Sequence, residues 1–280
     1  MILTREGQVG GGQSPSPLLK WPGGKRKLVR FLLPLIPQNF LSYYEPFMGS
    51  GALFFAMQPA RAFLSDKNAE LIATYNEVRD HPGSVIKRLQ ALKNSEASYY
   101  AVRDSIPTRK AARAARIIYL SRLSFNGIHR VNLKGRFNVP YSYKTHVDPC
   151  DPDKIRTASA LLQTARISCE DFETAVASAG RGDLVYFDPP YTTAHANNGF
   201  VKYNSKIFTW EDQKRLSDVA HELKKRGCFV FISNADHTSI RNLYREFDLL
   251  RIARHSVIAA SSEHRRAITE CIFHVPADAE

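Results

Sequence analysis

The tetrapeptide Asp188-Pro189-Pro190-Tyr191 is the segment best suited to chemistry, and it follows the apolar run Leu184–Phe187. Such a run predicts a buried strand, and ligands of open α/β sheets bind where strands end. The two prolines lack a backbone N–H, so the turn offers acceptors rather than donors at these positions. The Asp188 carboxylate and the Pro189 carbonyl can together accept both hydrogens of one NH2 group.

This arrangement suits an amino group on an aromatic base, such as N6 of adenine. The lone pair of that nitrogen is delocalised into the ring, and two hydrogen bonds to the amine favour a pyramidal, nucleophilic nitrogen. Positive charge develops on the nitrogen as it attacks a sulfonium methyl, and the Asp188 carboxylate stabilises that charge. Tyr191 offers a flat face for a flipped base. The alternative is a Pro-Pro turn capped by aspartate, without chemistry.

A second cluster, Glu45-Pro-Phe-Met-Gly-Ser-Gly51, ends an expected strand. Gly49 and Gly51 allow a tight turn and a close approach of the backbone to a ligand. Asp66 ends the next expected strand, which suits a carboxylate that binds ribose hydroxyls. The Walker and GxGxxG patterns are both absent, and a lone GxG is usually only a turn.

A third cluster, Leu19-Lys-Trp-Pro-Gly-Gly-Lys25, precedes the first expected helix. Trp21 could cover an adenine or methionine moiety, and Lys25 could meet a carboxylate. A helix-entry turn with two basic side chains is the open alternative.

Positive charge is concentrated in one part of the chain. The net charge is +12, and residues 81–150 hold 13 Lys+Arg against 3 Asp+Glu, for +10. Residues 1–80 hold 9 against 6, and residues 151–280 hold 17 against 18. A concentrated positive field favours a nucleic-acid partner, although a basic surface without a partner stays open.

Within that stretch, residues 122–140 interleave Arg and Lys with Phe, Asn and turn glycines. Arg can pair with guanine, Asn with adenine, and an aromatic ring can wedge between bases. Upstream, Arg109, Arg113 and Arg116 fall on one helical stripe, which suits phosphate contacts as well as simple solvation.

From Tyr43 onward, short apolar runs alternate with helical patterns, which predicts an α/β fold with a mostly parallel sheet flanked by helices. The expected strands are Tyr43–Pro46, Arg61–Ser65, Arg166–Cys169, Leu184–Phe187, Cys228–Ser233, Asp248–Ala253 and Ile268–Val275. A helix is expected over Asn68–Val78, with one apolar face formed by Leu71, Ile72, Tyr75 and Val78. A mobile loop is expected over Thr192–Phe208, and a turn that touches phosphate, or an idle exposed turn, over Ser261–Arg266.

Other classes of protein are disfavoured. No apolar run approaches the ~18 residues of a membrane span, and the first residues lack the apolar core of a signal peptide. The four cysteines have neither CxxC spacing nor a suitably placed His, so we expect reduced thiols and no metal: Cys150, Cys169, Cys228 and Cys271. We expect a soluble cytoplasmic protein.

In order and content, these clusters resemble the Dam-type DNA adenine-N6 methyltransferases. The resemblance runs from about Leu18 to Phe273. The shared motifs are KWPGGK, EPFMGSG, Asp66, RFNVP, DPPY and the strand end Phe231-Ile-Ser-Asn234. The resemblance implies a Rossmann-like methyltransferase fold, S-adenosylmethionine as cofactor, and flipping of the target base out of duplex DNA.

The resemblance also implies site residues. The cofactor-binding positions are Trp21, Lys25, Glu45, Phe47, Gly49, Gly51, Asp66, Asp171, Phe172 and Asp188. The catalytic positions are Asp188, Pro189, Pro190 and Tyr191. The sequence departs from the family's common residue at Asp171, where the cofactor's adenine would be held.

For DNA, the resemblance implies a hairpin over Phe125–Pro140 that reads GATC. The DNA-binding positions are Lys20, Phe125, Asn126, Ile128, Arg130, Asn138 and Pro140. Phe125 matches the intercalating aromatic, Arg130 the guanine reader and Lys20 the contact to the first guanine. Ile128 and Pro140 match apolar base contacts. Ile128 and Phe125 replace the usual Leu and Tyr.

The expected organisation has three parts. Residues 1–17 form a disordered segment, residues 18–68 with 156–280 the catalytic domain, and residues 69–155 a mainly helical target-recognition domain. We expect a monomer that acts on double-stranded DNA in a bacterial or phage setting, as in restriction-modification. The alternatives are a methyltransferase of the same fold acting on RNA or a protein amide, and a non-catalytic DNA-binding protein.

Overall fold

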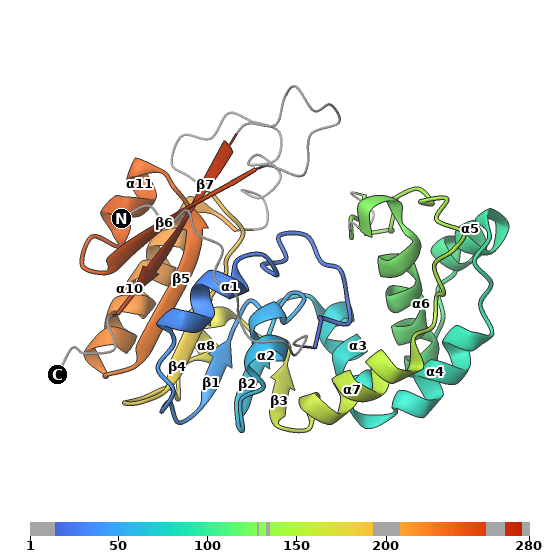
Figure 1. Ribbon diagram of the computed structural model, residues 1–280, viewed down its shortest axis with the longest axis horizontal. Coiled ribbons are helices and arrows are strands. Elements are labelled where there is room, and N and C mark those ends of the chain that lie inside the picture. Colours follow the sequence, from blue (N-terminus) through green and yellow to red (C-terminus); the bar gives the residue numbers. More distant parts are fainter. Residues whose placement is uncertain (1–14, 128, 133–134, 193–207, 256–266, 276–280) are drawn as a thin grey trace. The chain divides into compact units, whose positions relative to one another are not determined.

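The computed structural model describes residues 15–127, 129–132, 135–192, 208–255 and 267–275 (Figure 1). The chain falls into two units. The DPPY unit comprises Met1–Gly12, Leu35–Phe47 and Phe172–Glu280, and the helical unit comprises Gln13–Pro34 and Met48–Asp171. The chain therefore passes from one unit to the other inside the EPFMGSG motif and again between Asp171 and Phe172.

The DPPY unit contains strands in the order β1-β4-β5-β7-β6. The strands are β1 (Tyr43–Glu45), β4 (Leu184–Phe187), β5 (Phe229–Ala235), β6 (Asp248–His255) and β7 (Ala267–His274). β4 runs parallel to β1 and β5, whereas β7 is antiparallel to β5 and β6. Every residue of β4 is buried, as its uninterrupted apolar run predicts for a central parallel strand.

Helices accompany these strands. They are α8 (Phe172–Ala175), α10 (Trp210–Lys225) and α11 (Thr238–Leu243). Thr209 begins α10 with a capping box, because its side chain accepts from the Asp212 N–H while the Asp212 carboxylate accepts from the Thr209 N–H. The start of α10 at Trp210 is therefore fixed, with its cap Thr209 directly after Phe208.

The helical unit holds the parallel pair β2 (Ala62–Ser65) and β3 (Ala165–Ser168). Its helices are α1 (Val29–Leu32), α2 (Ala52–Met57), α3 (Ala69–Asp80), α4 (Pro82–Gln90), α5 (Glu96–Asp104), α6 (Lys110–Leu123) and α7 (Pro152–Leu162). A 3-10 turn, η1 (Leu33–Leu35), follows α1, and another, η2 (Phe125–Gly127), follows α6. Figure 1 shows α3 to α7 gathered in one cluster.

Two helices organise this cluster. The Asn68 side chain caps α3 by accepting from the Leu71 N–H at 3.0 Å, and the predicted apolar face of α3 is buried. α6 packs against α3, α4 and α5, and most of its residues from Ala114 onward are buried. α6 therefore forms the centre of the helical cluster, and the hairpin begins at its carboxyl end.

The predicted arginine stripe is wrong for one of its members. Arg109 and Arg113 are exposed, but the Arg116 guanidinium donates to the carbonyls of Val102 at 3.1 Å and Arg103 at 2.6 Å. These carbonyls lie in the last turn of α5, where helical partners are lacking. Arg116 therefore holds α5 against α6 rather than facing a phosphate.

The structure confirms the α/β class, the mostly parallel strands flanked by helices and the helical insertion with its hairpin. All seven predicted strands are present, with ends displaced by at most two residues. The division at residues 18, 68 and 156 stays a prediction. Residues 1–14, the interior of the predicted loop (193–207) and the turn at 261–266 lie outside the described residues.

Candidate active site

The half-buried Asp188 follows the last residue of β4, and the neighbouring strand β5 supplies its partner. Ser233 is fully buried and donates its hydroxyl to Asp188 Oδ1 at 2.6 Å. The Tyr186 hydroxyl lies 3.1 Å from Ser233 Oγ. Burial, together with the Asp188 charge, raises the pKa of Tyr186 well above its ordinary value, so the phenol stays protonated. A chain of two hydroxyls therefore orients the carboxylate.

A second buried pair supports the proline turn. Gln213 of α10 donates to the Pro190 carbonyl at 3.4 Å, and Asn234 of β5 donates to Gln213 Oε1 at 3.2 Å. Both side chains are fully buried. Because prolines cannot donate backbone hydrogen bonds, side chains from other elements must fix this turn. Sequence reasoning missed Gln213 and Tyr186, and it identified Ser233 and Asn234 only as part of a strand-end motif.

We predict that Ser233→Ala lowers kcat by about 10-fold, because the loss of one charge-assisted hydrogen bond worth ~1.5 kcal/mol frees the Asp188 carboxylate to rotate. Affinities for DNA and cofactor should change less than twofold. Single-turnover methyl transfer at saturating substrates measures the effect, with the exposed Ser178→Ala as control. Unchanged turnover in Ser233→Ala would show that the hydroxyl does not orient Asp188.

Phe47 and Phe172 form an aromatic cluster in the DPPY unit. Phe47 stacks on Phe172 with centroids 5.5 Å apart and meets Phe187 and Phe208 edge-on at 6.4 and 5.5 Å. The Arg215 guanidinium covers Phe172 at 4.3 Å. The cluster thus brings Phe47 and Phe172 together next to the end of β4.

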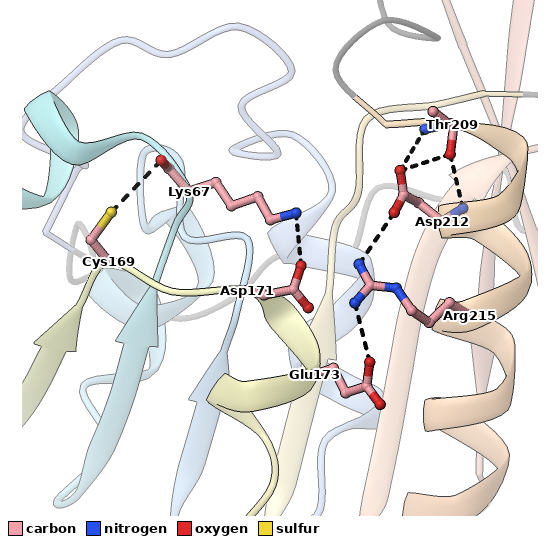
Figure 2. Close-up of polar contacts among 7 residues, drawn as sticks. All are labelled: Lys67, Cys169, Asp171, Glu173, Thr209, Asp212 and Arg215. Carbon is pink, nitrogen blue, oxygen red and sulfur yellow. Dashed lines mark hydrogen bonds and ion pairs between the residues drawn. The ribbon is translucent and has the colours of Figure 1, made fainter.

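Charged groups hold this cluster in place. Figure 2 shows Arg215 between Glu173 and Asp212, at 3.1 and 3.2 Å. Glu45 is buried, and its Oε2 accepts from the Tyr43 hydroxyl at 2.9 Å. The side chains of Glu45, Phe47 and Phe172 are therefore held by partners inside the DPPY unit.

In the helical unit, Asp66 organises the glycine turn. Its two carboxylate oxygens accept from the Gly49 N–H at 3.0 Å and the Asn68 N–H at 2.9 Å. Burial raises the pKa of Asp66, and the two backbone hydrogen bonds oppose that shift. Each carboxylate oxygen can accept more than one hydrogen bond, so a further donor can still be bound.

Gly51 is required by its conformation. Its φ is +65°, and a Cβ would lie 3.3 Å from both Met48 Cε and Phe55 Cε2. A side chain here would therefore be strained and would also press on the core. The prediction of a tight glycine turn is confirmed at this residue.

The remaining predicted cofactor positions in the helical unit have local partners. Asp171 forms an ion pair with Lys67 at 2.7 Å (Figure 2), which joins the segments that follow β3 and β2. Lys25 is buried, and its ammonium donates to the Gly23 carbonyl at 3.1 Å. Sequence reasoning gave no sign of the Lys67 partner.

The predicted hairpin is present in the helical unit. Its antiparallel hydrogen bonds join the Phe125 N–H to the Pro140 carbonyl at 2.9 Å and the Asn138 N–H to the Arg130 carbonyl at 3.1 Å. One face is buried, with Phe137, Val139 and Tyr141, and the other is exposed, with Arg136, Asn138 and Pro140. This alternation is the period-2 pattern of a strand with one solvated face.

The predicted DNA-binding positions among the described residues lie on exposed surface. Phe125 is 54% exposed, and Asn126 is exposed at φ +56°. Arg130 is exposed, and its Nε donates to Asn138 Oδ1 at 2.9 Å. Ile128 lies outside the described residues. The hairpin therefore presents its polar side chains and one large aromatic ring to solvent.

Lys20 lies beside the hairpin. Its backbone N–H donates to Ser121 Oγ at 2.9 Å, and Ser121 Oγ donates back to the Lys20 carbonyl at 3.1 Å. A Cβ on Gly127 would lie 2.4 Å from Lys20 Cδ, so only glycine admits this lysine stem. Burial, with Lys144 and Arg122 nearby, lowers the pKa of Lys20. Two further cations, Lys144 and Arg122, therefore lie near Lys20.

The hairpin also contains a half-buried histidine, His129. Burial, assisted by the Arg116 charge, lowers the pKa of His129 from 6.5 to about 4. Below pH 6.5 this histidine binds a proton in the unfolded chain, whereas in the folded chain it stays neutral until the pH approaches 4. The stability that neutral His129 contributes is therefore complete above pH 6.5 and is lost as the pH falls towards 4.

We predict that acidification from pH 7 to pH 5 costs the folded protein on the order of 2 kcal/mol through His129. Urea unfolding at both pH values measures the change in the free energy of unfolding. The His129→Phe variant should lack this component, which separates it from other titrating groups. An equal pH dependence in both proteins would show that His129 is not held neutral in the folded protein.

The comparisons with known proteins agree with this geometry. Residues 21–258 match the family model of the D12 class N6 adenine-specific DNA methyltransferases. The chain belongs to this family. As an adenine-specific DNA methyltransferase, it uses S-adenosylmethionine as methyl donor and DNA as substrate.

Its relatives include bacterial enzymes of similar length. The chain is 38% identical over 266 residues to the type II methyltransferase M1.LlaDCHI of Lactococcus lactis subsp. cremoris, covering 91% of this chain and 94% of that protein. It is 31% identical over 265 residues to the DNA adenine methylase of Haemophilus influenzae, covering 91% and 92%. The DNA adenine methylase of Escherichia coli K12 is 31% identical over 262 residues, covering 91% and 93%.

The residues present fit the cofactor of this methyltransferase. S-adenosylmethionine supplies, when bound, an electrophilic methyl group on a positively charged sulfur. Its ribose hydroxyls suit the Asp66 carboxylate at the glycine turn, and its carboxylate suits the Lys25 ammonium. Among the described residues, no group of three or more His, Cys, Asp and Glu could hold a metal ion, and no helix is long and apolar enough to cross a membrane.

Proposed function

We propose that this methyltransferase methylates N6 of adenine at GATC in duplex DNA, with the adenine flipped out of the helix. The observation that carries the proposal is the hairpin. It exposes Phe125, Arg130 and Asn138, whereas Phe137, Val139 and Tyr141 are buried on its other face, and Lys20 lies beside it. These are the side-chain types that wedge between bases and read guanine and adenine edges.

At the catalytic turn, Asp188 and the Pro189 carbonyl accept the two hydrogens of the N6 amino group. The Ser233 hydroxyl fixes the plane of the carboxylate, and Gln213 fixes the following peptide. Asp188 then stabilises the positive charge that develops on N6. In a paired duplex the adenine N6 donates a hydrogen bond to thymine, so the base must leave the stack before these contacts can form. Tyr191 provides the stacking face for it.

In the recognition hairpin, Arg130 reads guanine through two parallel hydrogen bonds. The Asn138 side-chain oxygen accepts from Arg130 Nε and so presets the direction of the guanidinium. Lys20 reads the first guanine, with its stem held against Gly127. Phe125 fills the space that the flipped base leaves.

We further propose a domain division, a set of cofactor positions, an oligomeric state and a cellular setting. Residues 18–68 with 156–280 form the catalytic domain, and residues 69–155 form the target-recognition domain. The cofactor positions named from the resemblance bind S-adenosylmethionine. The enzyme acts as a monomer without a required protein partner, and in a bacterial or phage setting it is associated with the nucleoid through DNA.

The test is tritiated methyl transfer from S-adenosylmethionine to a GATC duplex, matched duplexes with one base pair replaced, and RNA. The GATC duplex should be methylated far faster than every other acceptor. In Arg130→Ala, the preference for one guanine should fall by about 10- to 100-fold, the value of a bidentate contact worth ~1–3 kcal/mol. Arg136→Ala, an exposed arginine of the same hairpin, is the matched control and should keep the preference.

Two outcomes contradict the proposal in different ways. Equal methylation of GATC-free duplex would refute the sequence reading and leave the adenine chemistry standing. Label in RNA but not in DNA would refute DNA as the acceptor.

A further inference from the structure

The hairpin and the KWPGGK segment meet through two stacked rings. Trp21 and His129 lie with ring centroids 4.4 Å apart and an interplanar angle of 24°. The His129 ring also meets Phe137 edge-on, with centroids 5.4 Å apart. Phe137 is buried on the inner face of the hairpin. His129 therefore contacts both Trp21 and Phe137 of the hairpin core.

The stack depends on ring shape rather than on charge. Because the pKa of His129 is lowered to about 4, the imidazole is neutral near pH 7. The contact is then an offset stack between uncharged rings, for which flatness and size decide the geometry. A flat apolar ring at position 129 should therefore be an adequate substitute.

A second connection holds the same segment. The Lys20 backbone exchanges two hydrogen bonds with Ser121 at the end of α6, and the Lys20 stem packs on Gly127. Two anchors, one on α6 and one on the hairpin, thus fix the main chain of Lys20 and Trp21.

We infer that His129 is a positioning residue for sequence discrimination, because its stack on Trp21 sets the spacing between Lys20 and Arg130. Each of these proposed guanine readers is the direct chain neighbour of one of the stacked rings. Base readout needs both to be held to ~0.5 Å, and a stacked pair of rings supplies that rigidity. The inference rests on the proposed function, since it assigns the geometry of that recognition site.

The expected effect of His129→Ala is a loss of discrimination with little change in the chemical step. The preference for the cognate site over a duplex with one guanine replaced should fall at least 10-fold, and kcat at saturating DNA should stay within about twofold. His129→Phe should restore the preference. His129→Leu keeps apolar volume without a flat ring, and it should fail to restore the preference. This variant tests the inference if His129→Ala does not fold.

The experiment compares kcat/KM on cognate and single-substituted duplexes for the wild type and these variants. Trp21 emission is recorded in a Trp210→Phe background, so that the stack is observed directly; the alanine and leucine variants should change it, and the phenylalanine variant should not. Affinity for S-adenosylmethionine is measured in parallel, and the cofactor is kept saturating, because Trp21 is itself a proposed cofactor position.

The outcomes separate the inference from the proposed function. If the wild type itself shows no preference among the duplexes, the proposed sequence reading fails. If the wild type discriminates and His129→Ala or His129→Leu discriminates equally, the positioning role is overturned. Loss of preference in His129→Phe as well would show that the flat ring is not the feature that matters.

Discussion

Asp188→Ala should reduce methyl transfer to adenine by about 10²–10³-fold, the size expected when one preorganised electrostatic group is removed from a transition state. In the proposed mechanism this carboxylate accepts a hydrogen from the nitrogen that becomes positive, and the Ser233 hydroxyl already fixes its direction. Asp188→Asn should be less severe, because the amide oxygen can still accept one amino hydrogen. Single-turnover rates at saturating cofactor and DNA separate this loss from any change in affinity.

The control for this change is Asp218→Ala, which removes an exposed carboxylate from α10 in the same unit. Its rate should equal that of the wild type. DNA affinity of Asp188→Ala should stay within a few-fold, because the hairpin is untouched. A variant that kept more than a tenth of the wild-type rate would remove Asp188 from the chemical step.

Asp66→Ala should weaken binding of S-adenosylmethionine by about 100-fold, or ~2.7 kcal/mol. Two effects add here. The ribose loses its carboxylate partner, and the Gly49 and Asn68 N–H groups lose the acceptor that shapes the turn, at ~1 kcal/mol or more for each partly buried donor. Isothermal titration calorimetry measures the dissociation constant directly.

Asp153→Ala is the matched control, because Asp153 is a carboxylate of the same unit with a side chain that is 96% exposed. Its cofactor affinity should be unchanged. DNA binding by Asp66→Ala in the absence of cofactor should also be unchanged, since Asp66 lies outside the hairpin. Cofactor affinity equal to the wild type would mean that Asp66 does not line the cofactor site.

The strands could be predicted because each is a short apolar run with polar or turn residues at its ends. The strand predicted at Leu184–Phe187 has the same ends as β4, because Asp183 and Asp188 delimit the apolar run. β5 extends two residues further than expected, because Asn234 and Ala235 continue the pairing with β7. The hydropathy of the sequence does not indicate such backbone pairing. It therefore predicts the presence of a strand better than the residues at which the strand ends.

The residues proposed to touch substrate could be named from the sequence, but the residues that hold them in place could not. Ser233 is 45 residues from Asp188, and nothing in a hydroxyl residue reveals which carboxylate it meets. The Trp21–His129 stack likewise joins segments more than a hundred residues apart. For Arg116 the helical spacing predicted an exposed side chain, and this prediction is wrong. Its guanidinium donates hydrogen bonds to two carbonyls of α5.

The most direct test is a crystal structure of the enzyme with a GATC duplex and a non-reactive analogue of S-adenosylmethionine. The target adenine should stand outside the duplex, with N6 at ~3 Å from both the Asp188 carboxylate and the Pro189 carbonyl and with its ring on Tyr191. An adenine that stays paired, or one whose N6 points away from Asp188 while the analogue is bound, would contradict the account.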